Sequence, residues 1–316
     1  AQFGELAYPP GFAHFAYVNP DAPKRGTLIL APPQRTGFDK FNPFSLKGVP
    51  APGVSQLMFE SLLTISADEV ASAYGLLAES ARVATDRLSV SFRIRPSARF
   101  SDGSAVRAAD VKHSFEMLTG KFANPAYRAA YADVKRVVAL SEREVRFEFL
   151  RVNAELPLIV GTMPVFSENW GRKTDGNTLG FDRLAFEPPL ASGPYLIEKF
   201  DAGRSISYRR NPDWWARDIN VRRGMYNFDR IQVDFYRDSQ VALEAFKAGQ
   251  FDVNLEYSAK DWNTGYDSPA LRAGKFVQLA IPNHNPAGMQ GYVFNLRRPI
   301  FQDRRVREAI AQLFDF

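Results

Sequence analysis

Apolar and polar residues alternate with a period of two in several short stretches of the chain. In residues 89–95 and 144–150 every second side chain is valine, isoleucine or phenylalanine, and the same alternation recurs in 231–235. Such alternation is typical of strands that have one covered face and one solvated face. The continuous apolar run 26–31 predicts a further strand that is buried on both faces.

Two further patterns predict how some strands pair. Segments 193–197 and 205–209 are expected to form an antiparallel pair. Strand 231–235 precedes an amphipathic helix that ends near Gly249, and a strand at 251–255 is expected to follow. A strand, a helix and a strand in such a short span make a crossover unit, which predicts some parallel pairing in this region.

A period near 3.6 residues marks the predicted helices. Ala108, Val111, Phe115 and Leu118 share one face directly after a Ser-Asp-Gly turn, so this helix is expected to cover the neighbouring sheet. A shorter helix is expected around 55–63. The Asp102-Gly103 pair itself is a turn signal.

The two ends of the chain have a different character. The first 25 residues contain X-Pro steps that disfavour helix, so an extended segment pinned by tyrosine and phenylalanine is expected. Near the other end, Asp303 can cap a helix whose apolar stripe comprises Val306, Ala309, Ile310, Leu313 and Phe314. That stripe requires a packing partner, so Phe316 is expected to mark a break inside a domain.

Composition limits the possible classes of protein. The 316 residues are 45% hydrophobic and 24% charged, which is typical of a soluble globular chain of roughly two domains. The net charge of +5 is spread along the chain, so no nucleic-acid partner is predicted. Cysteine is absent, and no apolar run reaches the ~18 residues that a membrane span requires. The start at Ala1 fits a chain after signal-peptide removal and also a trimmed chain.

No catalytic or metal-binding constellation is found in the sequence. The three histidines are far apart and lack metal-ligand spacing, so no metal and no cofactor are predicted. There is no Gly-x-Ser-x-Gly elbow, no His-Glu-x-x-His and no phosphate-binding glycine-rich loop. The sequence therefore offers no catalytic site, and the protein is expected not to be an enzyme.

Four segments resemble the signatures of the family 5 extracellular solute-binding proteins. In order along the chain they are Phe100–Glu116 (FSDGSAVRAADVKHSFE), Ala191–Trp215, Ala242–Val253 (ALEAFKAGQFDV) and Val293–Phe316. Their order and spacing are similar to those of the family. His14–Leu28 and Phe41–Gly48 further resemble a subgroup that serves the importer for oligopeptides and the peptide-nucleotide antibiotic microcin C.

The resemblance implies an α/β fold, the periplasmic binding protein-like two-lobe fold of type II with an extra subdomain. Family members are much longer, so the chain is expected to hold lobe one and the start of lobe two. The implied divisions are 1–60 for the first segment of lobe I, 61–187 for an inserted α+β subdomain, 188–290 for the second segment of lobe I, and 291–316 for the crossover into lobe II.

The resemblance also implies a function and its partners. The protein is expected to be exported to the periplasm, to capture oligopeptides or peptide-like solutes as a monomer, and to deliver them to the membrane permease of an ABC importer. The same fold serves non-peptide solutes such as oligosaccharides, opines and nickel chelates, and these stay open as cargo. A hydrolase or a chaperone-like protein is the alternative from another class.

Candidate ligand-binding residues follow from the same resemblance. Gly48, Val49 and Ala51 match a segment that pairs with the peptide main chain, an arrangement that tolerates varied side chains. Pro50 lacks an N–H, which limits that pairing. The remaining candidates are Asn254 and Glu256 on the wall of lobe one, and Tyr292 and Asn295 at the crossover between lobes.

Overall fold

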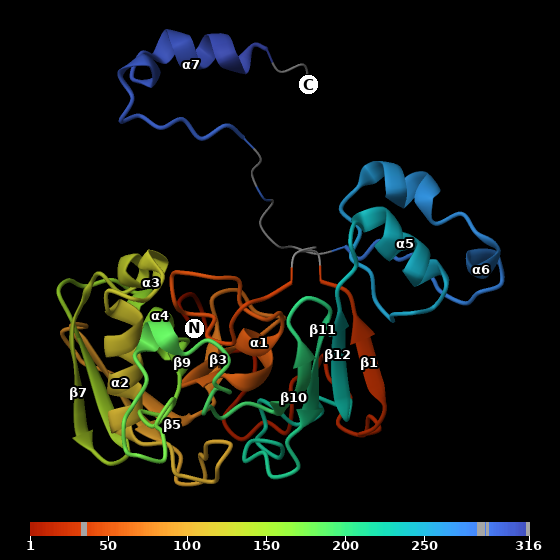
Figure 1. Ribbon diagram of the computed structural model, residues 1–316. Helices are drawn as coiled ribbons and strands as arrows, with labels where there is room; N and C mark the ends of the chain where they lie inside the picture. Colours follow the sequence, from red (N-terminus) through yellow and green to blue (C-terminus); the bar gives the residue numbers. More distant parts are fainter. Residues whose placement is uncertain (33–36, 283–287, 289–290, 314–316) are drawn as a thin grey trace. The chain divides into compact units, whose positions relative to one another are not determined.

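The computed structural model describes residues 1–32, 37–282, 288 and 291–313 (Figure 1). The chain divides into two compact units, Ala1–Lys275 and Phe276–Phe316. In the first unit, two four-stranded sheets lie at opposite sides, with α1 (Val54–Met58) and short strand pairs between them (Figure 1). The second unit holds a short helical segment and is described separately below.

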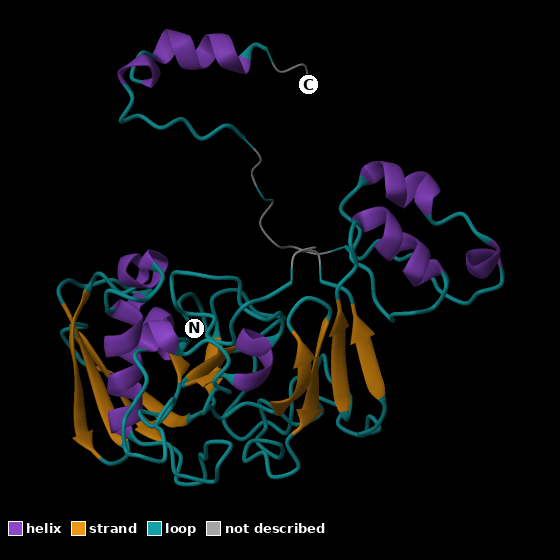
Figure 2. Ribbon diagram, viewed as in Figure 1, coloured by secondary structure: helices purple, strands orange, loops and turns teal. Residues whose placement is uncertain are grey.

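The first sheet is antiparallel and lies entirely within residues 78–149. Its strands follow the order β5 (Ala78–Val83), β6 (Ser89–Ile94), β8 (Glu144–Phe149) and β7 (Val134–Ser141). Helix α2 (Ala108–Thr119) packs against β7 and β8 (Figure 2). Phe92 and Phe147 are fully buried on the covered face. The predicted strands 89–95 and 144–150 and the covering helix are therefore confirmed.

The second sheet combines both kinds of pairing. Its order is β1 (Thr27–Leu30), β12 (Arg230–Asp234), β11 (Ser205–Arg210) and β10 (Tyr195–Asp201). The pair β1–β12 is parallel and the other two pairs are antiparallel. The pair β10–β11 confirms the antiparallel pairing predicted for 193–197 and 205–209, and the prediction that part of the sheet is parallel is confirmed by β1 and β12. β1 is only half-buried, against the prediction of a fully buried strand, because it lies at the edge of the sheet.

Short elements connect the two sheets. The predicted helix 55–63 is shorter than expected, because α1 (Val54–Met58) ends where Phe59 becomes extended and β2 (Glu60–Ser61) pairs with β9 (Pro164–Val165). The other short elements are β3 (Leu63–Ile65), which pairs with β4 (Ala73–Gly75), α3 (Pro125–Ala130), α4 (Leu156–Gly161) and the 3-10 turn η1 (Phe181–Arg183).

The crossover that follows β12 is only partly as predicted. Helix α5 (Ser239–Lys247) is capped by the Asp238 carboxylate, which accepts a hydrogen bond from the Val241 N–H at 2.9 Å. Strand 251–255 does not form, and a single parallel bridge joins Val253 to Leu30. The Asp252 carboxylate accepts from the Ile29 N–H at 2.7 Å, so a side chain takes the place of a ladder carbonyl.

Two smaller elements complete the first unit, a π-helical turn η2 (Asp261–Gly265) and α6 (Pro269–Arg272). The N-terminal segment before Thr27 has no helix or strand. Tyr8 and Phe12 pack against Tyr74 with ring centroids 5.7 and 5.4 Å apart, which confirms the predicted aromatic anchoring.

The second unit contains η3 (Pro299–Phe301) and α7 (Arg304–Ala311). The Asp303 carboxylate accepts from the Arg305 N–H at 2.9 Å, which confirms the predicted cap. Within this unit none of the described residues of α7 is buried. Phe314, the last member of the predicted stripe, lies outside the described residues.

Candidate functional site

A cavity of about 620 Å³ opens where β1 and β12 end. Its walls come from five places in the chain. These are Leu30–Pro32 after β1, Pro52–Leu57 around the start of α1, Ile231 and Val233 of β12, Ser239 at the start of the crossover helix, and Val253–Asp261 after that helix. Ligands of open α/β sheets bind outside the carboxyl ends of the parallel strands. The volume falls within the range of small-molecule sites, about 300–1,000 Å³. We call this space the Asn254 cavity.

Asn254 and Glu256 lie together in the wall of the cavity and share one partner, Tyr266. The Asn254 amide donates to the Tyr266 hydroxyl at 2.5 Å, and that hydroxyl donates to Glu256 Oε2 at 2.8 Å. Burial, followed by the hydrogen bond to Glu256, raises the pKa of Tyr266 to about 12. The phenol is therefore protonated at neutral pH and remains a donor.

The second carboxylate oxygen of Glu256 is also occupied. Glu256 Oε1 accepts from the N–H groups of Tyr257 and Ser258 at 2.9 and 2.7 Å. Both oxygens therefore hold the local chain in place, and the arrangement fixes the backbone between residues 254 and 258. Glu256 acts here as a positioning residue for the cavity wall.

Apolar side chains alternate with this polar set and are exposed. Val253, Leu255 and Tyr257 line the cavity and are 47%, 70% and 80% exposed. Apolar side chains exposed next to one another mark contact surfaces. Leu255, Tyr257 and Tyr266 are not among the residues predicted from the sequence. The period-two alternation of 253–257 could have indicated the first two, whereas no local pattern indicates Tyr266.

The segment Gly48–Ala51 lies immediately before the part of the cavity wall that begins at Pro52. The Val49 N–H donates to the Asp39 carboxylate at 2.6 Å, and the Ala51 N–H donates to the Lys40 carbonyl at 2.8 Å. Among the described residues, the main-chain groups of Gly48 and the carbonyl of Pro50 make no hydrogen bond, while the N–H groups of Val49 and Ala51 are paired within the chain.

The shape of this segment depends on Gly48 and Lys40. Gly48 has φ +86°, and a Cβ there would lie 2.5 Å from Asp39 Oδ1, so only glycine fits without a shift. The buried Lys40 ammonium donates to the Ser45 carbonyl and hydroxyl and to the Lys47 carbonyl, at 2.7, 3.0 and 2.5 Å. Burial lowers the pKa of Lys40. These bonds hold the loop that presents Gly48.

Tyr292 and Asn295 belong to the second unit and are described apart from the cavity. Tyr292 is 67% exposed. The Asn295 side-chain oxygen accepts from the Arg297 main-chain N–H at 3.1 Å, which forms a local turn. The structure thus brings Asn254 and Glu256 together and places Gly48, Val49 and Ala51 in one other segment of the first unit.

Two kinds of feature are absent from the described part of the chain. It contains no cluster of three or more histidine, aspartate or glutamate side chains that could hold a metal ion. Among the described residues, no helix has the length and apolarity needed to cross a membrane.

The family of the chain follows from its similarity to known proteins. The profile of the bacterial extracellular solute-binding proteins, family 5, matches residues 72–316. The chain belongs to this family, as its four sequence motifs predicted. The fold is accordingly the mixed α/β fold of periplasmic binding proteins, with lobe one as its main part.

The curated proteins similar to this chain include one that is described as peptide-binding. A protein of Agrobacterium fabrum described as probable peptide-binding protein YejA is 39% identical over 99% of this chain and 51% of its own length. The chain thus spans about half the length of the curated relatives it matches.

Two solved structures share the fold. DppA from Helicobacter pylori in complex with the peptide STSA aligns with a TM-score of 0.65 and 17% identity, over 78% of this chain and 50% of that one. MoaA from Agrobacterium tumefaciens R10 in complex with mannopinic acid aligns with a TM-score of 0.67 and 21% identity, over 93% and 56%.

Proposed function

We propose that the protein is the periplasmic substrate-binding component of an ABC importer, which captures short peptides or peptide-like solutes and hands them to a membrane permease. The observation that carries the proposal is the Asn254 cavity, whose wall combines a fixed polar set with exposed apolar side chains. Pockets of this composition bind small ligands by apolar contact and orient them with few polar groups. The name of the Agrobacterium fabrum relative supports peptide cargo.

In this proposal each candidate residue has a physical role. The open main-chain groups of Gly48 and Pro50 pair with an extended ligand, and Lys40 keeps their loop in shape. Asn254 and Glu256 fix the wall through Tyr266, while Leu255 and Tyr257 contact the cargo. Tyr292 and Asn295 contribute from the segment that leads into the second lobe. The protein works without a metal, a cofactor or a catalytic step, as a monomer.

The domain division is part of the same proposal. Residues 61–187 form the inserted subdomain, and 1–60 together with 188–290 form lobe I. Two facts support this division: the sheet β5–β6–β8–β7 lies wholly inside 61–187, and the other four-stranded sheet joins β1 to strands after residue 190. The segment 291–316 leads into lobe II.

A non-peptide cargo is the second candidate, because MoaA, which has the same fold, was solved with mannopinic acid. Native mass spectrometry of the full-length protein, purified without added ligand, separates the two. Released adducts that fragment as peptides support the proposal, whereas an opine-like or sugar-like adduct contradicts the peptide assignment.

A matched pair of variants tests the site itself. Tyr266→Phe removes the hydroxyl that links Asn254 to Glu256, so the affinity for the released peptide should fall about five-fold, the equivalent of one hydrogen bond. Tyr236→Phe is the control, since its ring packs on Phe251 and its hydroxyl makes no hydrogen bond within the described residues. If calorimetry gave equal peptide affinities for the two variants, the Tyr266 hydroxyl would have no role in ligand binding.

A further inference from the structure

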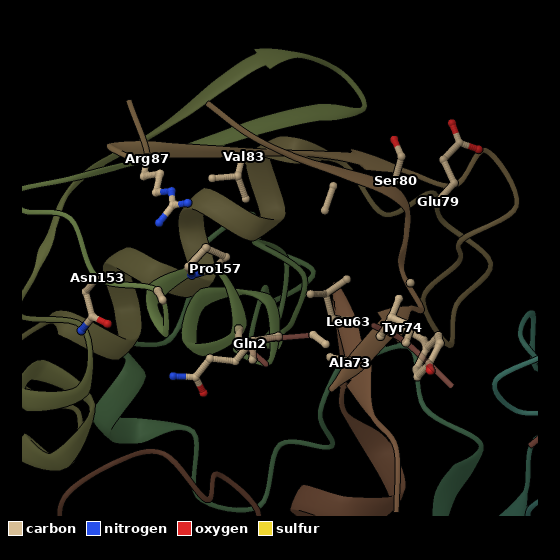
Figure 3. Close-up of a pocket in the computed structure, with 16 residues that line it drawn as sticks. Gln2, Leu63, Ala73, Tyr74, Glu79, Ser80, Val83, Arg87, Asn153 and Pro157 are labelled. Carbon is tan, nitrogen blue, oxygen red and sulfur yellow. The ribbon is translucent and has the colours of Figure 1, made fainter. Parts of the chain in front are cut away.

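A second cavity, of about 580 Å³, lies beside strand β5 and shares no lining residue with the Asn254 cavity. Figure 3 shows its walls: β5 along one side, the β3–β4 pair with Leu63 and Ala73 opposite, Gln2 of the N-terminal segment beside that pair, and Asn153 and Pro157 before and within α4. We call this space the β5 cavity.

The outer edge of β5, which borders this cavity, has no strand partner within the described residues. β5 is an edge strand whose only strand neighbour in the described sheet is β6. The Ala84 N–H donates to the Ser89 carbonyl, and β5 residues pair in register with β6 from Arg82↔Ser91 to Val83↔Val90. In an antiparallel ladder bonded and non-bonded pairs alternate. The N–H and C=O groups of Ala81 and Val83 therefore point away from β6, and both residues line the cavity.

The positively charged side chain of Arg87 lies at one end of this unpaired strand edge. Arg87 follows β5 in a tight turn closed by its own N–H, which donates to the Ala84 carbonyl at 2.9 Å. Its φ is +58°, an uncommon conformation for a residue other than glycine. Figure 3 shows the Arg87 side chain reaching into the cavity toward Pro157. Among the described residues Arg87 forms no salt bridge, whereas Glu79 is paired with Arg93 at 3.1 Å.

The opposite side of the cavity is mainly apolar, with the amide of Gln2 as a polar member that donates to Glu155 Oε1 at 3.3 Å. Leu63, Ala73 and Leu158 line it, and Leu63 is itself buried against Gly161 of α4. The cavity therefore offers three things to one ligand: free strand-pairing groups, apolar surface opposite them, and a guanidinium at the end of the strand. An extended peptide with a free carboxyl terminus has the complementary groups in the same order.

We propose that the β5 cavity is a second binding site, which takes a short apolar peptide as an added strand on β5 with its terminal carboxylate on Arg87. Guanidinium groups bind carboxylates with two parallel hydrogen bonds, which selects a free carboxyl terminus over an amide. The site is separate from the Asn254 cavity, so its existence does not depend on the proposed transport function.

The test uses the full-length protein and a defined probe, an N-acetylated tetrapeptide of alanine, valine and leucine with either a free carboxyl terminus or a terminal amide. Calorimetry should show about five-fold weaker binding of the amide, as expected for one exposed charge pair. Arg87→Gln should weaken the free-acid probe by the same factor and abolish the difference between the probes. Arg82→Gln is the control, because Arg82 is an exposed arginine of the same strand that does not line the cavity.

Hydrogen exchange then locates the probe. Binding should protect the amides of Ala81 and Val83 and leave those of residues 254–258 unchanged. Several results would overturn the proposal: no binding of either probe at millimolar concentration, equal affinities of Arg87→Gln and the native protein, or protection confined to 254–258. Decanoate binding as tightly as the peptide would also overturn it, because a fatty acid has no main chain to pair.

Discussion

The same alternation of apolar and polar residues has opposite outcomes in two regions of this protein. In β6 and β8 the alternate side chains, among them Phe92 and Phe147, are fully buried beneath α2. In residues 253–257 the alternate side chains are Val253, Leu255 and Tyr257, and they stay exposed at the Asn254 cavity. The pattern identifies an apolar face, and only the fold decides whether the protein or another molecule covers it.

This difference assigns different tasks to the two regions. Burial of an apolar side chain stabilises the folded state by about 25 cal/mol per Å² of surface removed from water. In the sheet β5–β6–β8–β7 the apolar side chains are removed from water when the chain folds. In segment 253–257 the apolar side chains remain in contact with water, so their burial can contribute to the binding of another molecule. Substitutions in the first region should therefore change stability, and substitutions in the second should change binding.

The largest effect is expected from Phe147→Ala in the covered sheet. Phe147 is fully buried and packs edge-on against Phe92 at 5.9 Å, so its truncation leaves a cavity beneath α2. We expect a loss of about 3–5 kcal/mol in the free energy of unfolding. Urea denaturation of the full-length protein measures it. A loss below about 1 kcal/mol would show that this face is not the core that the comparison requires.

A buried ion pair provides the next test, at the short strand β2. Glu60 is fully buried, accepts from the Trp215 indole at 2.9 Å, and faces the Arg222 guanidinium at 3.4 Å. Burial outweighs these partners and raises the pKa of Glu60 to about 7. Because the folded state holds this proton more tightly than the unfolded chain, stability should decline as pH rises from about 4.5 to about 7.

The magnitude of that decline is on the order of 3 kcal/mol for a single carboxyl group. Glu60→Gln keeps a group of similar shape without titration, and it should flatten this part of the pH profile. Chemical denaturation at several pH values compares the variant with the native protein. An unchanged slope in Glu60→Gln would assign the pH dependence to other groups.

Two glycines, one of them in the segment Gly48–Ala51, allow the cost of backbone strain to be measured apart from the cost of a steric contact. Gly48 and Gly103 have nearly equal φ values, +86° and +85°, but a Cβ meets Asp39 at 2.5 Å only at Gly48. Gly103→Ala should cost about 1–2 kcal/mol from backbone strain alone. Gly48→Ala should cost more and should also weaken ligand binding, because Asp39 must move away from Val49. If thermal denaturation gave equal losses of stability for Gly48→Ala and Gly103→Ala, the steric contact between a Cβ at residue 48 and Asp39 would be contradicted.

The elements that the sequence predicted well are those in which local periodicity and burial agree. β6, β8 and α2 follow their patterns because their apolar positions found partners inside the subdomain. The predicted strand 251–255 is wrong, since the Asp252 carboxylate takes the Ile29 N–H and ends the ladder at one bridge. A side-chain carboxylate that bonds in place of a main-chain carbonyl does not change the pattern of apolar and polar residues, so the sequence does not reveal it.

The candidate site shows the same limit. Family resemblance selects Asn254 and Glu256, and the structure places both in the cavity wall. Their common partner Tyr266 lies beyond the π-helical turn η2, so only the folded chain brings it to them. Resemblance also selects Gly48 as a ligand residue, but its left-handed backbone and its tight fit to Asp39 are properties of the folded loop alone.

The smallest effect on stability is expected from Leu255→Ser in the uncovered segment. Leu255 is 70% exposed, so its replacement removes little buried surface, and the free energy of unfolding should change by less than about 0.5 kcal/mol. Peptide affinity of the full-length protein should nevertheless fall about ten-fold, because loss of one leucine-sized contact on binding is worth about 1.5 kcal/mol. Val70→Ser is the matched control, since Val70 is 85% exposed and lies outside both cavities. If both variants bind alike, the apolar face of 253–257 is ordinary surface, and the contrast with the covered sheet has no functional meaning.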